Sequence, residues 1–137
     1  MAGRPRTLTL SVTPVLVGAA LAGAVEGNVH WPAVLAALAG SVFIQLGTNI
    51  HNDAADFERG GDRRDRIGPP RVTASGLLTA TAVKRGAIVC FAIAALMGVY
   101  LVFVGGWPIL MLGLLCIASG WGYTGGPFPI AYTPLGE

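Results

Sequence analysis

Four long apolar segments alternate with polar connections along the chain. They lie at about 8–25, 32–50, 86–104 and 107–123, and none of them contains a charged residue. Roughly 20 apolar residues cross the hydrocarbon core of a bilayer, and a lipid-facing segment satisfies its backbone hydrogen bonds internally by forming a helix. The pattern therefore predicts an all-α membrane bundle of about four transmembrane helices, a single membrane domain over residues 1–137.

A polar pattern begins where the second apolar segment ends, and it continues the same helical period. At 100° per residue, the side chains of five residues fall within an arc of roughly 100°: Gln45, Asn49, Asn52, Asp53 and Asp56. His51 and Phe57 point elsewhere. The second helix is therefore expected to run to about residue 56, with a polar face at its end, and to be followed by a loop over 57–85.

Composition supports a protein that lives in a lipid bilayer. Hydrophobic residues make up 53% of the chain and charged residues only 12%, about half the charged share of a typical soluble domain. The formal net charge of +2 is too small to indicate nucleic-acid binding. We therefore expect the bilayer, and no nucleic acid, among the partners of this chain.

The basic residues predict an orientation in the membrane. Arg4 and Arg6 precede the first helix, and all the other Lys and Arg residues lie between the second and third, whereas the connections at 26–31 and 105–106 contain none. Basic loops stay on the cytoplasmic side of a membrane. The N-terminus and the 51–85 loop are thus expected in the cytoplasm, and the protein is expected to be a multi-pass protein of the cell (inner) membrane.

The acidic residues on the polar helix face have the chemistry of a metal site. Asp53 and Asp56 lie one turn apart and repel each other unless a cation lies between them. Mg²⁺ commonly uses one or two carboxylates and completes its shell with water and phosphate oxygens. Gly60-Gly61 then breaks the helix, so that Asp62 and Asp65 can fold back toward the site. The pattern predicts Mg²⁺ as a cofactor.

Arginines follow these acids and suit a phosphate ligand. Their forked donors match a phosphate dianion, and the residues concerned are Arg63, Arg64, Arg66 and Arg71. Lys84 has two interpretations: it anchors the third helix at the membrane interface, or it reaches a bound diphosphate. Acids that hold a metal beside arginines that hold phosphate predict a site for a diphosphate with Mg²⁺.

A non-catalytic interpretation competes with this one. The same stretch could be a solvated, salt-bridged loop, or the basic loop of a membrane protein that binds anionic lipid head groups or a partner chain. Polar groups at membrane depth, however, are costly and usually functional. A CDP-alcohol phosphotransferase is a further alternative, but its Asp-Gly-x-x-Ala-Arg signature is missing from the sequence.

A family resemblance supports the metal and diphosphate interpretation. The chain resembles the UbiA-type membrane prenyltransferases, and within them the branch that prenylates 1,4-dihydroxy-2-naphthoate in menaquinone biosynthesis. The resemblance rests on Asn49-x-x-Asn52-Asp53-x-x-Asp56, Gly60-x-Asp62 and Arg66-x-Gly68-Pro69-Pro70-Arg71. The stretches at 4–8, 123–132 and 135–137 are also similar to that family, so the likeness spans the whole chain.

The resemblance implies an enzyme that transfers a polyprenyl group from polyprenyl diphosphate to an aromatic acceptor, with Mg²⁺ as cofactor. Asp53 and Asp56 would act in catalysis as metal ligands, with Asp62 as a third ligand. The diphosphate would be bound by Asn49, Asn52, Arg66 and Arg71, with Lys84 as an additional candidate.

The chain departs from the family pattern in one respect. The family has a second aspartate-rich motif in a later helical repeat, and that motif is absent from these 137 residues. We therefore expect a fragment, a truncated product, or half of a split enzyme. The expected partner is then a second chain that carries the missing motif.

Overall fold

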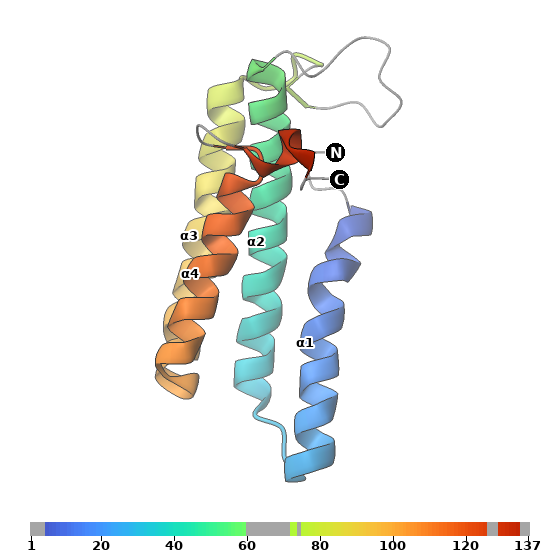
Figure 1. Ribbon diagram of the computed structural model, residues 1–137, viewed down its shortest axis with the longest axis vertical. Coiled ribbons are helices and arrows are strands. Elements are labelled where there is room, and N and C mark those ends of the chain that lie inside the picture. The colour runs from blue at the N-terminus through green and yellow to red at the C-terminus, as the bar shows by residue number, and fades with distance from the viewer. Residues whose placement is uncertain (1–4, 60–71, 74, 126–128, 135–137) are drawn as a thin grey trace.

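The computed structural model describes residues 5–59, 72–73, 75–125 and 129–134, and these are almost entirely helical. The elements are α1 (Pro5–Glu26), α2 (Trp31–Glu58), α3 (Ala80–Gly105), α4 (Trp107–Gly122) and the short 3-10 helix η1 (Ile130–Tyr132). No strand occurs in the described part of the chain. Figure 1 shows the four long helices side by side along the long axis of the molecule. The predicted all-α bundle is confirmed.

Three of the helices, α1, α2 and α3, are long and apolar enough to cross a membrane. Helix α4 is also apolar but has 16 residues, so it is roughly 24 Å long, shorter than the ~30 Å hydrocarbon core. Helices α2 and α3, with 28 and 26 residues, are longer than that core requires. The end of α2 and the start of α3 can therefore extend past the apolar layer of this multi-pass membrane protein.

Small residues let α2 pack closely against its neighbours. A Cβ added to Gly47 would lie only 3.2 Å from Cβ of Cys90 and 3.2 Å from Cε2 of Phe91 on α3. On α4, a Cβ added to Gly120 would lie 2.5 Å from Oγ1 of Thr48. Close backbone approach of this kind is typical of helix packing in membranes. Helix α2 is the centre of the bundle and contacts α1, α3 and α4.

The connection between α2 and α3 is shorter than the sequence pattern predicts. Helix α2 continues to Glu58, and α3 begins at Ala80 rather than at 86. Oγ1 of Thr79 accepts a hydrogen bond from the backbone N–H of Ala82 at 3.2 Å, so Thr79 caps the helix as threonines commonly do. The apolar pattern missed this start because Lys84 and Arg85 interrupt it, although a helix tolerates charges once it has left the bilayer.

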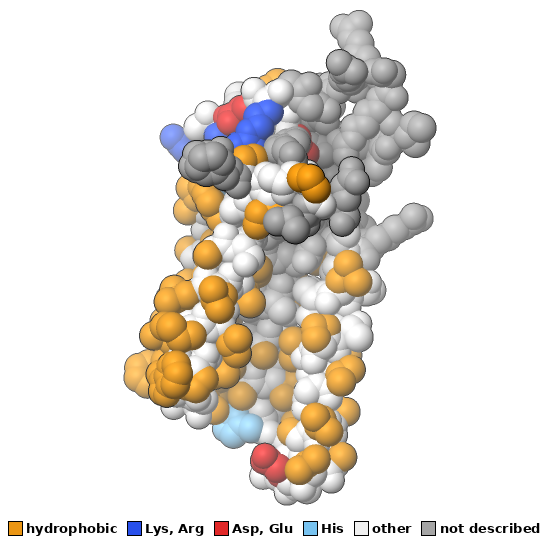
Figure 2. Space-filling model, in the orientation of Figure 1, with side chains coloured by type: hydrophobic (Ala, Val, Ile, Leu, Met, Phe, Trp, Pro, Cys, Tyr) orange, Lys and Arg blue, Asp and Glu red, His pale blue; other side chains and the backbone are white. Residues whose placement is uncertain are grey.

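Most of the surface along the helices is apolar, and the charged side chains lie mainly at one end of the bundle. Hydrophobic side chains cover most of the helices in Figure 2, whereas the described Lys, Arg, Asp and Glu side chains gather mainly where α2 ends and α3 begins. That end also contains the polar residues singled out by the sequence pattern. The fold therefore brings the candidate site to one end of the bundle.

Candidate functional site

One stretch near the end of α2, residues 51–55, is buried in every direction although it is rich in polar residues. Five consecutive residues, 51–55, are buried, with His51 and Asp53 each 3% exposed and Asn52 8% exposed. Five consecutive residues point all the way round a helix. Neighbouring segments must therefore enclose this part of α2, and its buried polar groups need hydrogen-bond partners.

Threonines from separate segments provide these partners. On one side, Nδ2 of Asn49 donates to Oγ1 of Thr7 in α1 at 2.8 Å. On another, Oδ2 of Asp53 accepts from Oγ1 of Thr73 at 3.0 Å and from its backbone N–H at 3.3 Å. Thr73 precedes α3 and is itself only 3% exposed. The predicted polar face is therefore tied to the segments that begin α1 and lead into α3.

A third threonine follows α4 and bonds to the same face. The hydroxyl of Thr124, which is 2% exposed, donates to Oδ1 of Asn52, and Nη1 of Arg59 donates to the backbone carbonyl of Thr124. The turn at 123–125 is thus attached to α2 at two points. All three neighbouring helices contribute a segment to the enclosure of the α2 end.

His51 points away from the aspartates, as the helical period predicts, and it packs against Trp121. Its ring lies 4.1 Å from that of Trp121, centroid to centroid, and Trp121 lies edge-on to Phe91 at 6.1 Å. A Cβ added to Gly125 would lie 2.7 Å from Cε1 of His51. The end of α4 and the following turn therefore pack directly against the His51 ring.

The structure describes only some of the remaining predicted site residues. Asp56 lies on the last turn of α2 and is half-buried. Lys84 forms an ion pair with Glu58, with Nζ 2.7 Å from Oε2, and both side chains are exposed. The other predicted ligands, Asp62, Arg66 and Arg71, lie outside the described residues. Of the predicted diphosphate donors, the described ones gather at the α2 end.

The described carboxylates fit Mg²⁺ as part of a larger shell. Within the described residues no cluster of three or more His, Cys, Asp or Glu side chains occurs. Asp53 and Asp56 lie one turn apart on α2. Mg²⁺ commonly binds one or two carboxylates together with phosphate and water oxygens. The donor set on α2 therefore matches a metal that is bound together with a phosphate ligand.

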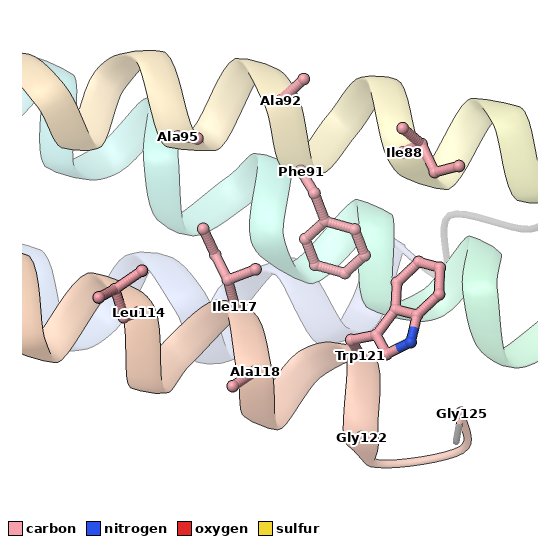
Figure 3. Close-up of a pocket in the computed structure, with 10 residues that line it drawn as sticks. All are labelled: Ile88, Phe91, Ala92, Ala95, Leu114, Ile117, Ala118, Trp121, Gly122 and Gly125. Carbon is pink, nitrogen blue, oxygen red and sulfur yellow. The ribbon is translucent and has the colours of Figure 1, made fainter. Parts of the chain in front are cut away.

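An apolar groove begins beside this polar cluster. It has a volume of about 860 Å³ and lies between α3 and α4. Figure 3 shows Phe91 from α3 and Trp121 from α4 pointing toward each other in it, with Leu114 and Ile117 further along α4. Trp121 and Gly125 line the groove and also contact His51. The apolar groove therefore begins where the end of α4 packs against the end of α2.

Sequence reasoning missed the residues that hold the site together: Thr7, Thr73, Thr124 and Gly125. Each is uncharged, and each lies far along the chain from its partner on α2. One signal was available for Thr124 and Gly125, since the stretch at 123–127 takes part in the family resemblance. The resemblance marked this stretch as part of the family pattern but did not predict which residues it contacts.

Comparison with known proteins agrees with the geometry. The model of the UbiA prenyltransferase family matches residues 11–137. A protein of Mycobacterium tuberculosis named 1,4-dihydroxy-2-naphthoate octaprenyltransferase is 40% identical over 134 residues, which cover 98% of this chain and 45% of that protein. Proteins with the same name from Bacillus subtilis and Escherichia coli are 39% and 36% identical, over 98% of this chain and 43% and 45% of their own lengths.

The chain spans about half the length of the curated relatives it matches. No solved structure matches it.

Proposed function

Because this chain belongs to the UbiA prenyltransferase family, we propose that its polar site binds a polyprenyl diphosphate and takes part in moving the polyprenyl group to an aromatic acceptor. The names of the relatives favour 1,4-dihydroxy-2-naphthoate as the acceptor, and with it a role in menaquinone synthesis. One observation carries the proposal: Thr124 bonds to Asn52 in the buried polar array near the end of α2, and the next residue, Gly125, lines a long apolar groove.

The polar array suits the diphosphate head. The carboxamide of Asn52 can donate hydrogen bonds to phosphate oxygens, and Arg66, Arg71 and Lys84 are proposed as further diphosphate ligands. Asn49, whose Nδ2 donates to Thr7, is proposed to support the site rather than to hold the diphosphate directly. Asp53 and Asp56, with Asp62, would hold Mg²⁺, which when bound offsets the negative charge that develops on the leaving diphosphate. In this role the side chains orient the head group so that its bond to the prenyl carbon points into the apolar region.

The apolar groove between α3 and α4 suits the polyprenyl tail of the substrate. Its walls are apolar side chains of α3 and α4, and it starts at Trp121 and Gly125, next to the polar site. Gly125 directly follows Thr124, the partner of Asn52, so an amphiphile with its head at Asn52 would have the apolar groove close by. Exclusion of water by such walls would protect the allylic cation until an electron-rich aromatic carbon attacks it.

We also propose that the polar end of the bundle faces the cytoplasm of a bacterial inner membrane, because the basic residues gather there. Ser75 lies just before α3, and Asn28 lies in the opposite connection, between α1 and α2. In a background without Cys90 and Cys116, a membrane-impermeant maleimide should label Asn28→Cys in intact spheroplasts but label Ser75→Cys only after lysis. Labelling in the reverse order would overturn the orientation.

The binding step is tested on the chain itself in lipid nanodiscs. Wild-type protein is expected to bind a radiolabelled polyprenyl diphosphate in the presence of Mg²⁺, and Asp53→Asn and Asp56→Asn are expected to weaken binding at least tenfold. Glu26→Gln is the matched control, because it also removes one acidic side chain but lies at the far end of α1. Unchanged binding in the double aspartate variant would sink the proposal.

The transfer step is tested with 1,4-dihydroxy-2-naphthoate and the labelled diphosphate in membranes. It is measured with the chain alone and together with a second chain that carries the second aspartate-rich motif, since the family resemblance implies that this motif contributes to the site. If the arginines matter both for binding to anionic vesicles and for binding of the diphosphate, while the aspartates matter for neither, the basic loop is a lipid-binding element and the enzymatic role is wrong.

A further inference from the structure

The turn at 123–125 is attached to the end of α2 through hydrogen bonds of the buried Thr124 and through the close packing of Gly125. Thr124 is 2% exposed, its hydroxyl donates to Oδ1 of Asn52, and its carbonyl accepts from Arg59. Gly125 leaves no room for a Cβ, since one would meet His51 and the carbonyl of Trp121. The turn is therefore fitted to α2 by shape as well as by hydrogen bonds, which gives Thr124 a fixed position.

In the structure, the bond from Thr124 is made to the oxygen end of the Asn52 carboxamide. A carboxamide has one acceptor oxygen and one nitrogen with two donor hydrogens. The hydroxyl of Thr124 donates to the oxygen, so the donor nitrogen is turned away from Thr124. An amide oriented in this way offers hydrogens to an anion rather than an oxygen to a cation.

Asn49 shows the opposite arrangement one turn earlier on the same face. Its nitrogen, Nδ2, donates to the hydroxyl oxygen of Thr7 at 2.8 Å. Two asparagines on one helix face are therefore oriented by threonines in opposite senses. The orientation of Asn52 is therefore specific to its own contact with Thr124 and is not a general property of the helix face.

We propose that Thr124 is a positioning residue that holds the Asn52 carboxamide with its N–H groups toward the diphosphate, an assignment that rests on the proposed function. Thr124 itself touches no substrate. It acts by holding the carboxamide in the observed orientation: with the oxygen bonded to Thr124, the nitrogen is the end that can donate to a phosphate oxygen. The turn after α4 thereby becomes part of the diphosphate site on α2, although Thr124 and Asn52 are 72 residues apart in sequence.

The test measures binding of inorganic diphosphate with Mg²⁺ to the whole chain in nanodiscs. Thr124→Val keeps the shape of the side chain and removes the hydroxyl, and it is expected to weaken binding roughly tenfold, the equivalent of one well-placed hydrogen bond. Thr124→Ser keeps the hydroxyl and is expected to bind within about twofold of wild type. Thr133→Val is the matched control, because Thr133 is exposed and its hydroxyl donates only locally, to the carbonyl of Ile130.

Two further variants separate positioning from a general loss of structure. If Thr124 acts through Asn52, Thr124→Val should have no additional effect in an Asn52→Ala background, whereas a merely structural defect would add to it. Asn52→Asp replaces the donor nitrogen by oxygen and should weaken diphosphate binding. An Asn52→Asp variant that binds Mg²⁺ and diphosphate more tightly would instead make the oxygen of Asn52 a metal ligand, and the proposal would be wrong.

The outcomes distinguish this inference from the proposed function. If wild-type chain binds no diphosphate, both fail. If wild-type binding depends on Asp53 and Asp56 while Thr124→Val binds as tightly as wild type, only the positioning role fails. Circular dichroism reports whether Thr124→Val is folded, and Thr124→Ala provides a smaller replacement that carries the same expectation if valine does not fit.

Discussion

Oγ1 of Thr73 lies 3.0 Å from Oδ2 of Asp53, and the backbone N–H of the same threonine also points to that oxygen. Both residues are 3% exposed. A buried carboxylate is stable only where donors replace the water it has lost. Thr73 therefore stabilises Asp53 in one orientation, and it ties the segment before α3 to the end of α2.

Removal of this hydroxyl should destabilise the protein. Thr73→Val leaves a buried carboxylate with one donor fewer, so the free energy of unfolding should fall by about 1–3 kcal/mol. Thr73→Ser keeps the donor and should stay close to wild type. Titration with SDS from a mild detergent measures the difference, and a valine variant as stable as wild type would show that the hydroxyl is not needed to satisfy Asp53.

Gly125 should not tolerate even one additional methyl group. In Gly125→Ala the Cβ would lie 2.7 Å from Cε1 of His51 and 2.6 Å from the carbonyl oxygen of Trp121. Overpacking of this kind typically costs about 1–3 kcal/mol. Gly113→Ala on α4 is the control, since a Cβ there meets nothing within 4 Å. A Gly125→Ala protein with an unchanged unfolding midpoint would mean that the turn does not rest on His51.

The ion pair between Lys84 and Glu58 provides a test of the role predicted for Lys84. Both side chains are exposed, so loss of the pair should change the free energy of unfolding by less than about 1 kcal/mol. If Lys84 binds diphosphate, Glu58→Gln frees it and should strengthen binding roughly threefold, while Lys84→Met should weaken it by a similar factor. Lys84→Met binding that equals wild type would leave Lys84 as an interface anchor. Arg85→Met, at the next position, is the control.

Removal of metal should abolish ligand binding without unfolding the bundle. The hydrogen bonds described for Asp53 and Asn52 come from threonines, so the fold of the α2 end does not need a cation. With EDTA, diphosphate binding should fall at least tenfold and return with added Mg²⁺, while the helical circular dichroism signal and the unfolding midpoint stay nearly constant. Diphosphate binding that persists in EDTA would contradict a metal-dependent site.

The helices could be predicted from the sequence because the bilayer imposes a simple rule. An apolar run of sufficient length must be helical, and the same period placed Asn52 and Asp53 on one face and His51 on another. The start of α3 could not be predicted from the apolar pattern. It depends on the cap by Thr79, and the apolar run begins only after Lys84 and Arg85.

The contacts of the site could not be predicted because they depend on how the helices pack. Thr124 reaches Asn52 across 72 residues, and Thr7 reaches Asn49 across 42. A single uncharged hydroxyl gives no signal in composition or periodicity. The packing of His51 against Trp121 likewise depends on the position of α4, which is set by small residues such as Gly120.

The groove between α3 and α4 allows the tail site to be tested with two adjacent leucines. Leu114 lines the groove, whereas Leu115 is similarly exposed but does not line it, at 54% and 63%. Leu114→Trp should partly fill the groove and weaken binding of a long polyprenyl diphosphate roughly tenfold, the cost of displacing a few buried methylene groups. It should leave inorganic diphosphate binding unchanged, because the head site is separate. Leu115→Trp should affect neither ligand. Equal loss in both variants would mean that the tail lies elsewhere on the bundle.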